Sequence, residues 1–153
     1  MKKKDGWFYN FINQDKIFID KYDSEDPFGR VIWSLGYLMS SGNLPQPLIK
    51  RAGAIFKKAG KNTAKLESLR AIAFTIIGLC YIAKIESYGN GLATANQIKN
   101  LADKLVKKYK HQAVKPKNKE KKWFWFEDGL TYSNYKLPES LLRAYQITKN
   151  KEY

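Results

Sequence analysis

Hydrophobic residues recur at helical spacing along most of this chain, and they form two kinds of pattern. The segment from Phe28 to Met39 and the stretch ESLRAIAFTIIGLCYIAKIES (67–87) are apolar on nearly every side, which predicts buried helices. The stretches LPQPLIKRAGAIFKKAG (44–60) and GLATANQIKNLADKLVKKYK (91–110) each carry a single apolar stripe, which predicts half-exposed helices. The stretch LPESLLRAYQITKN (137–150) is interpreted as a fifth, buried helix.

Capping residues indicate where three of these helices begin. Asp26 is the predicted N-cap of the first helix, with Pro27 at its first position and Gly42 after its end. Ser68 is the predicted N-cap of the third helix, and Pro138 lies near the first position of the fifth. The fourth helix is expected to point a stripe inward that comprises Leu92, Ile98, Leu101, Leu105 and Val106.

The alternation of buried and half-exposed helices predicts an all-α fold of stacked hairpins, with inner helices and outer helices. We expect residues 1–25 to form an extended or hairpin segment that packs on the domain. Residues 26–153 are then a partial (α/α) toroid of about two and a half hairpins, similar to half of a six-hairpin ring. If neighbouring helices are antiparallel, the three inner helices start at the same end, and polar residues collect there as a rim.

Length and composition limit the classes of protein that this chain can belong to. It has 153 residues, 44% hydrophobic and 27% charged, which is typical of one soluble globular domain. Cys80 is the single cysteine, so a disulfide framework within the chain is excluded. The N-terminus does not resemble a secretory signal, and the apolar run Ala71–Ala83 is shorter than the roughly 20 residues of a membrane span. We therefore expect a cytoplasmic protein with no membrane span.

The net charge of +14 adds an alternative function. Ten lysines and only two acids lie between Lys99 and Lys122, whereas the whole chain has four arginines. One interpretation is a solvated helix face followed by a surface loop. The other is a lysine-rich protein that binds single-stranded nucleic acid or an anionic surface, with the neighbouring aromatic residues stacking on bases. The sequence leaves both open.

Candidate chemistry is concentrated in WFWFEDGLTYSNYKLPESLL, which runs from Trp123 to Leu142. With one histidine and one buried cysteine, we expect no nucleophilic triad based on histidine or cysteine, no metal and no cofactor. Sugar chemistry can use two carboxylates, and Asp26 and Glu127 are the predicted catalytic pair because both lie on the expected rim. The predicted substrate-binding residues on the same rim are Arg30, Arg70, Trp123, Trp125, Asp128, Tyr132 and Asn134.

Structural roles are an alternative for each of these residues. Asp26 could only cap a helix and pair with Arg30, and Glu127 could belong to the turn before Gly129. The two tryptophans could pack in the core. The hypothesis of a functional site depends on the expected co-location of these residues at one rim.

Several segments resemble one family of proteins. The stretches DGWFYNFI, SEDPFGRVIWSLGY, SLRAIAFTIIGL and WFWFEDGLTYSNYKLPESLL are similar, in this order, to the N-terminal half of a bacterial and archaeal helical-toroid family. Its members occur alone or fused to glycosyltransferase modules and are described as glycosyltransferase-like or glycosidase-like. The resemblance covers roughly residues 5–145. It implies a toroid fold and a carbohydrate-binding or carbohydrate-active function, with an enzyme favoured, and it implies no particular reaction.

The chain also departs from the family pattern. Leu69 stands where the family tends to have a proline, and Ser133 stands where it tends to have an aspartate. The second half of the toroid does not follow within these 153 residues. We therefore expect a second half-domain, or a second copy of the chain, to complete the ring. A glycan or sugar substrate is the other expected partner, together with a candidate glycosyltransferase module.

Overall fold

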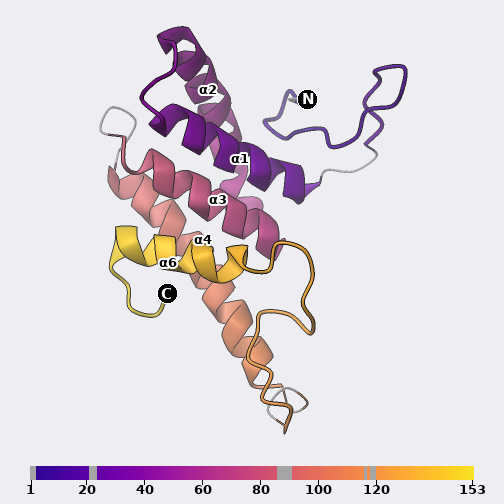
Figure 1. The fold of residues 1–153 in the computed structure, drawn as a ribbon, viewed down its shortest axis with the longest axis vertical. Coiled ribbons are helices and arrows are strands. Elements are labelled where there is room, and N and C mark those ends of the chain that lie inside the picture. The colour runs from indigo at the N-terminus through magenta and orange to yellow at the C-terminus, as the bar shows by residue number, and fades with distance from the viewer. Residues whose placement is uncertain (1–2, 21–23, 86–90, 116, 118–119) are drawn as a thin grey trace.

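The computed structural model describes residues 3–20, 24–85, 91–115, 117 and 120–153, and its regular elements are helices (Figure 1). They are α1 (Glu25–Ser40), α2 (Gln46–Ala59), the short 3-10 helix η1 (Gly60–Lys65), α3 (Leu69–Ile82), α4 (Gly91–Ala113) and α6 (Lys136–Thr148). No residue in these described ranges belongs to a β-strand. The predicted all-α class is confirmed.

Helix α3 is the centre of the fold. It packs against α1, α4 and α6, and α2 packs against α1. Nearly all of its residues are buried, as expected for a helix that is apolar on every side. Figure 1 shows α1, α3 and α6 side by side, all starting at the right of the view and running to the left. The three helices therefore present their N-terminal ends at one end of the layer.

Small residues allow α1 and α3 to approach closely. A Cβ atom at Gly78 would lie 2.5 Å from the Ile32 carbonyl oxygen, and one at Gly29 would lie 2.7 Å from the Ala71 Cα. Gly36 faces the Gly78 carbonyl in the same way. Because each contact is made with backbone, no side-chain rotation could relieve it. The glycines thus set the distance between these two helices.

The main core lies between α3 and its neighbours. Phe28 and Ile32 of α1 are fully buried, and so are Ile98, Leu101 and Leu105 of α4. Burying one such side chain stabilises the fold by about 1.5–3 kcal/mol relative to leaving it exposed. Other members of the same cluster come from α3 and α6 and include Ile72, Ile76, Leu79, Leu137, Leu141 and Ala144.

One expectation about the helix faces is corrected. Leu92 was expected to point inward, but its side chain is 78% exposed in the first turn of α4. Leu142 and Tyr145 of α6 are exposed as well, so α6 is buried on one side only. The spacing of apolar residues in a segment predicts a helix. How much of that helix is buried depends on how many neighbouring elements cover it.

The helix starts agree with the sequence in one case and differ in two. The Ser68 side chain accepts a hydrogen bond from the Ala71 amide, which confirms it as the N-cap of α3. The N-cap of α1 is Ser24 rather than Asp26, and α6 begins at Lys136, two residues before Pro138. In α1 the Asp26 carboxylate pairs with Arg30 instead of capping the helix.

The N-terminal segment forms a hairpin that is tied to the helices. Ile12 and Phe18 form an antiparallel bridge, closed by a turn in which the Asn13 side chain accepts from the Ile17 amide. Phe8 is buried against Phe28, with ring centroids 6.0 Å apart. This segment covers part of α1. Among the described helices, none combines the length and the apolar character that crossing a membrane would need.

Candidate functional site

One side of the layer made by α1, α3 and α6 carries charged and aromatic residues in place of the apolar core. Residues three, four or seven apart fall on one side of a helix, and each helix supplies such a stripe. The stripes are Asp26, Arg30, Trp33 and Tyr37 on α1; Arg70, Phe74 and Tyr81 on α3; and Lys136, Glu139 and Arg143 on α6. We call these ten residues the three-helix face. On α3 this stripe lies about 180° from Ile72, Ile76 and Leu79 of the core.

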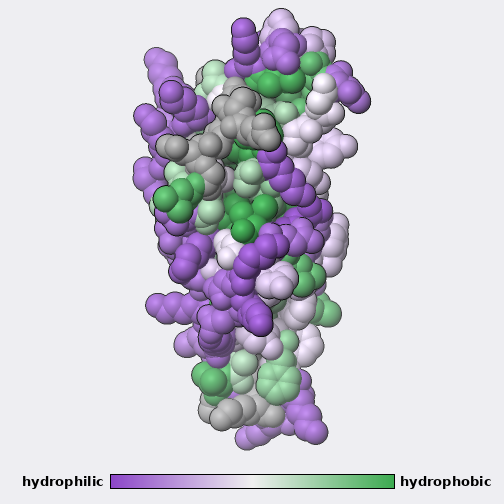
Figure 2. All heavy atoms as spheres, turned by 90° about the vertical axis from the view of Figure 1, so that its left-hand side faces the viewer, coloured by the Kyte–Doolittle hydropathy of each residue, from purple (hydrophilic) through white to green (hydrophobic). Residues whose placement is uncertain are grey.

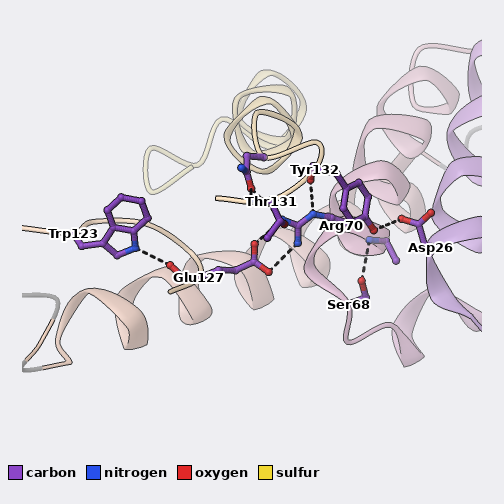
Figure 3. Close-up of polar contacts among 9 residues, drawn as sticks. Asp26, Ser68, Arg70, Trp123, Glu127, Thr131 and Tyr132 are labelled. Atoms are coloured by element: carbon purple, nitrogen blue, oxygen red, sulfur yellow. Dashed lines mark hydrogen bonds and ion pairs between the residues drawn. The ribbon is translucent and has the colours of Figure 1, made fainter. Parts of the chain in front are cut away.

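Arg70 organises the N-terminal end of the three-helix face. Its guanidinium donates to both carboxylate oxygens of Glu127 at 2.8 and 2.7 Å, and its Nε donates to the Tyr132 carbonyl at 2.6 Å (Figure 3). It also donates to Thr131 Oγ1 and to Asn134 Oδ1. Arg70 is 7% exposed, and the hydrogen bond with Glu127 raises its pKa above the ordinary value. The loop before α6 is therefore fastened to the first turn of α3.

Asp26 connects this loop to α1. The Tyr132 hydroxyl donates to Asp26 Oδ1 at 2.7 Å, and Arg30 Nε donates to Asp26 Oδ2 at 2.6 Å. Partial burial, followed by the hydrogen bond to Asp26, raises the pKa of Tyr132 above the ordinary tyrosine value. The Arg70 guanidinium also lies over the Tyr132 ring, with its Cζ 4.8 Å from the ring centroid. Residues from α1, α3 and the loop thus form one polar network.

Aromatic rings and cations occupy the middle of the face. The rings of Trp33 and Phe74 are nearly parallel, with centroids 5.6 Å apart. Arg30 lies 4.7 Å from the Phe74 centroid, and Lys136 Nζ lies 4.2 Å from the Trp33 centroid. Cation–π contacts of this kind are worth about 0.5–2 kcal/mol. Trp33 of α1 and Lys136 of α6 therefore meet above α3 and cover Phe74.

A groove opens towards the C-terminal end of α1. It has a volume of about 660 Å³ and is lined by Trp33, Ser34, Tyr37, Leu38, Ser41, Leu44 and Tyr81. Tyr37 and Tyr81 meet edge to face, and Arg143 lies 5.4 Å from the Tyr81 centroid. Figure 2 looks at the end of the molecule where α1 and α3 finish, and it shows apolar patches between hydrophilic side chains. The groove is thus lined both by aromatic rings and by the hydroxyl groups of serine and tyrosine side chains.

Glu139 is held between two cations on α6. Lys136 Nζ donates to Oε2 at 2.7 Å and Arg143 Nε donates to Oε1 at 2.9 Å. Desolvation by partial burial raises the pKa of Glu139, but the hydrogen bonds from both cations outweigh it and the net pKa is lowered. Glu139, like Asp26, is thus an acid of the three-helix face with a cationic partner.

The two predicted tryptophans lie beside the network rather than on the three-helix face. Trp123 Nε1 donates to the Glu127 carbonyl at 2.8 Å, so the indole supports the loop (Figure 3). Trp125 packs against the core and against Phe126, edge to face. Its buried Nε1 has no hydrogen-bond partner in the part of the chain that the structure describes. Both side chains hold the loop in place in this structure.

Asp128 points to a different part of the molecule. Gln112 Nε2 donates to its Oδ1 at 2.5 Å, and Lys117 Nζ lies 3.3 Å from the same oxygen. The hydrogen bond from Lys117 is the main cause of its lowered pKa. The structure therefore brings together Asp26, Arg30, Arg70, Glu127, Tyr132 and Asn134 of the predicted set in one network, whereas Asp128 bonds to Gln112 and Lys117 instead.

Asp128 belongs to a second concavity, which we call the lysine cleft. One wall comprises Lys104, Lys107, Lys108, His111 and Gln112 of α4, together with Lys115 just after its end. The opposite wall comprises Glu67, Ser68, Leu69, Arg70, Ile72, Glu127 and Asp128. The volume is about 790 Å³. Lys104 bonds to Glu67 and to the Leu66 carbonyl, so part of the basic charge is neutralised within the cleft.

Seven residues of the three-helix face were not predicted as site residues from the sequence. They are Trp33, Tyr37, Phe74, Tyr81, Lys136, Glu139 and Arg143. A signal was present, because polar and aromatic residues at helical spacing interrupt helices that otherwise read as core. That signal was hidden since large aromatic residues are equally common in cores.

Metal binding has no support in the described ranges, where no group of three or more His, Cys, Asp or Glu side chains is placed to hold an ion. Comparison with known proteins adds no relationship to these observations: no family model, no curated protein and no solved structure matches this chain.

Proposed function

We propose that the three-helix face binds a glycan. The observation that carries this proposal is the junction of an open aromatic groove with a hydrogen-bonding network, at Trp33 and Arg30. Sugars have apolar C–H faces that pack on aromatic rings and hydroxyl groups that bond to carboxylates and guanidinium groups. Binding sites for small molecules combine apolar and aromatic lining with a few fixed polar groups in the same way.

The arrangement of the helices supports the same proposal. We propose that α1, α3 and α6 are inner helices of a partial (α/α) toroid and that α2 and α4 are outer ones. The three-helix face would then be the concave side of the ring. The resemblance to a glycosyltransferase-like and glycosidase-like family points to the same ligand class. A second half-domain or a second copy would supply the facing wall.

Within this proposal the two predicted catalytic carboxylates have different roles. Both oxygens of Glu127 accept from Arg70, which is itself buried, so Glu127 acts as a positioning residue for the loop. Asp26 is bonded by Arg30 and Tyr132, and a carboxylate has room for further hydrogen bonds. We assign Asp26 to contact with the sugar. If the glycan is also cleaved or transferred, Asp26 is the acid or base to test first.

The test is a titration with neutral and acidic oligosaccharides that follows amide chemical shifts and tryptophan fluorescence. We expect shifts at Trp33, Tyr37 and Tyr81 for at least one class of glycan, and we expect Asp26→Asn to weaken its binding by about tenfold or more. Glu67→Gln is the matched control, because this acid is exposed on the lysine cleft. An absence of shifts on the three-helix face for every glycan class would overturn the proposal.

The lysine cleft supports a second candidate function, the binding of single-stranded nucleic acid or another polyanion. The observation in its favour is that Lys104, Lys107, Lys108 and His111 of α4, with Lys115 just after its end, line one concavity. Trp123 lies near the end of the same region, in a small pocket with Lys117 and Lys121. Lysines would neutralise phosphates, and the affinity would depend strongly on salt.

Charge-neutralising variants decide this second candidate. We expect an unstructured oligonucleotide to bind with an affinity that falls steeply as salt rises, and we expect Lys107→Gln with Lys108→Gln to reduce the slope. Lys57→Gln with Lys58→Gln, at the end of α2, controls for net charge. Equal losses in the two double variants would show that only the overall charge matters, and the lysine cleft would then be excluded as a specific site.

A further inference from the structure

We infer that the ligand of the three-helix face is an oligosaccharide that lies lengthwise along α1, with its terminal sugar at Asp26 and later units on Trp33 and Tyr37. This inference rests on the proposed glycan-binding function and adds the size of the ligand and its direction.

The length of the stripe on α1 is the first argument. Asp26, Arg30, Trp33 and Tyr37 are spaced by four, three and four residues, so they form one continuous row. With a rise of about 1.5 Å per residue the row is about 16 Å long. That is far longer than one sugar ring, and a ligand that contacts both ends must consist of several units.

The two ends of the row differ, and the difference gives the direction. At the Asp26 end, Tyr132 comes from the loop before α6 and bonds to α1, while its backbone carbonyl bonds to Arg70 of α3. The loop therefore crosses this end of the layer and limits how far a chain can extend. At the other end, the groove is open, and Tyr37 is 60% exposed. A chain can enter there and continue outward.

The chemistry changes along the row as an oligosaccharide would require. Asp26, Arg30 and Tyr132 offer hydrogen-bonding groups where a terminal sugar presents the largest number of free hydroxyls. Trp33 and Tyr37, one helical turn apart, offer aromatic surface for units further along the chain. Ser34 and Ser41 add hydroxyl groups beside these rings. Lys136 and Arg143 from α6 border the same surface.

The experiment measures affinity against chain length. Malto-, cello-, manno- and chito-oligosaccharides of one to six units are titrated against the full chain by calorimetry, together with an octyl monoglycoside. For the class that binds, we expect the affinity to rise by about tenfold for each aromatic platform that is reached. It should then level off once the row is filled.

Three variants locate the effect. Tyr37→Ala should remove the gain in affinity from the longer chains, so that these chains bind no more tightly than the disaccharide. Asp26→Asn should weaken all lengths by a similar factor. Tyr145→Ala is the matched control, because this tyrosine is also exposed but lies on the other side of α6. Since Tyr37 is largely exposed, its truncation is compatible with folding, and a thermal melt verifies this.

The outcomes separate the inference from the proposed function. Binding of a sugar with no dependence on chain length would overturn the oligosaccharide inference and leave the glycan proposal intact. Tighter binding of the octyl monoglycoside than of any oligosaccharide would also overturn it, because the groove would then hold an apolar chain. If no sugar of any length binds, the proposed function itself fails.

Discussion

Arg70 and Glu127 lie 57 positions apart in the sequence and share two parallel hydrogen bonds of 2.8 and 2.7 Å. This pair fixes the loop before α6 to the start of α3. The paired geometry needs a planar fork of donors, which only arginine provides. The position of α6 relative to α3 depends on this contact. So does the position of the α6 residues that belong to the three-helix face.

Replacing Arg70 should therefore lower the free energy of unfolding more than replacing an exposed charged residue does. We expect Arg70→Lys to lower the free energy of unfolding by about 1–3 kcal/mol, because a lysine cannot serve Glu127, Asn134 and the Tyr132 carbonyl together. The measurement is urea denaturation followed by circular dichroism. Arg51→Lys on the exposed side of α2 is the control, with an expected change within about 0.5 kcal/mol. Equal midpoints for both variants would show that the loop does not depend on Arg70.

The glycine contact between α1 and α3 gives a second prediction. Gly78→Ala places a methyl group 2.5 Å from the Ile32 carbonyl, so the helices must separate. We expect a loss of about 1–3 kcal/mol or more, as for other overpacked cores. Gly60→Ala is the matched control, because nothing lies within 4 Å of its added Cβ and its backbone is helical. A thermal melt of both variants distinguishes a clash from a change in backbone entropy.

Tyr132 predicts a dependence of stability on alkaline pH. Its pKa is raised in the folded state by partial burial and by the hydrogen bond to Asp26, so the folded state holds the phenolic proton more tightly than the unfolded one. This contribution to stability is complete below the ordinary tyrosine pKa of about 10 and is lost as the pH rises through the folded-state value. The stability difference between the protein and Tyr132→Phe should therefore shrink above about pH 10. A difference that is constant between neutral and alkaline pH would contradict the hydrogen bond.

Cys80 offers a direct measure of how tightly α3 is enclosed. Its side chain is 3% exposed, and burial raises its pKa to about 12. We expect an aromatic disulfide reagent to label it rapidly in denaturant and only through opening of the fold in native buffer. The ratio of the two rates then reports the free energy of opening. Fast labelling in native buffer would mean that the packing of α3 against its neighbours is loose.

The sequence predicted the helices well because their signals are local. Ser68 caps α3 as expected, since a serine side chain reaches an amide three residues ahead whatever surrounds it. Asp26 is also a residue type that commonly caps helices, but its carboxylate instead accepts hydrogen bonds from Arg30 and from Tyr132, which is 106 positions away. The depth of each helix was less predictable. Leu92 fits the stripe of α4 but lies beyond the neighbours that would cover it.

The site was predictable only where polar residues flank helix ends. Arg70, Glu127 and Tyr132 stand out in the sequence because they adjoin apolar helices, and the common direction of α1, α3 and α6 brings them together. Trp33 and Tyr81 lie inside helices whose sequence pattern predicts burial on every side. Their exposure therefore depends on which side of each helix is covered by another element. Asp128 adjoins Glu127 in sequence, but successive loop residues point to different sides.

The Glu25 carboxylate at the start of α1 accepts hydrogen bonds from the Glu67 and Ser68 amides at 2.8 and 2.6 Å, just before α3 begins. Together with the Gly36–Gly78 contact, these bonds connect α1 to α3 near both ends, so we expect the two helices to move as one unit. Helix α6 is joined to α3 by its packing, by the Arg70 loop and by Arg143, which lies against the Tyr81 ring. If the three-helix face widens to admit a ligand, we expect α6 to move while the spacing of the rings on α1 and α3 stays constant.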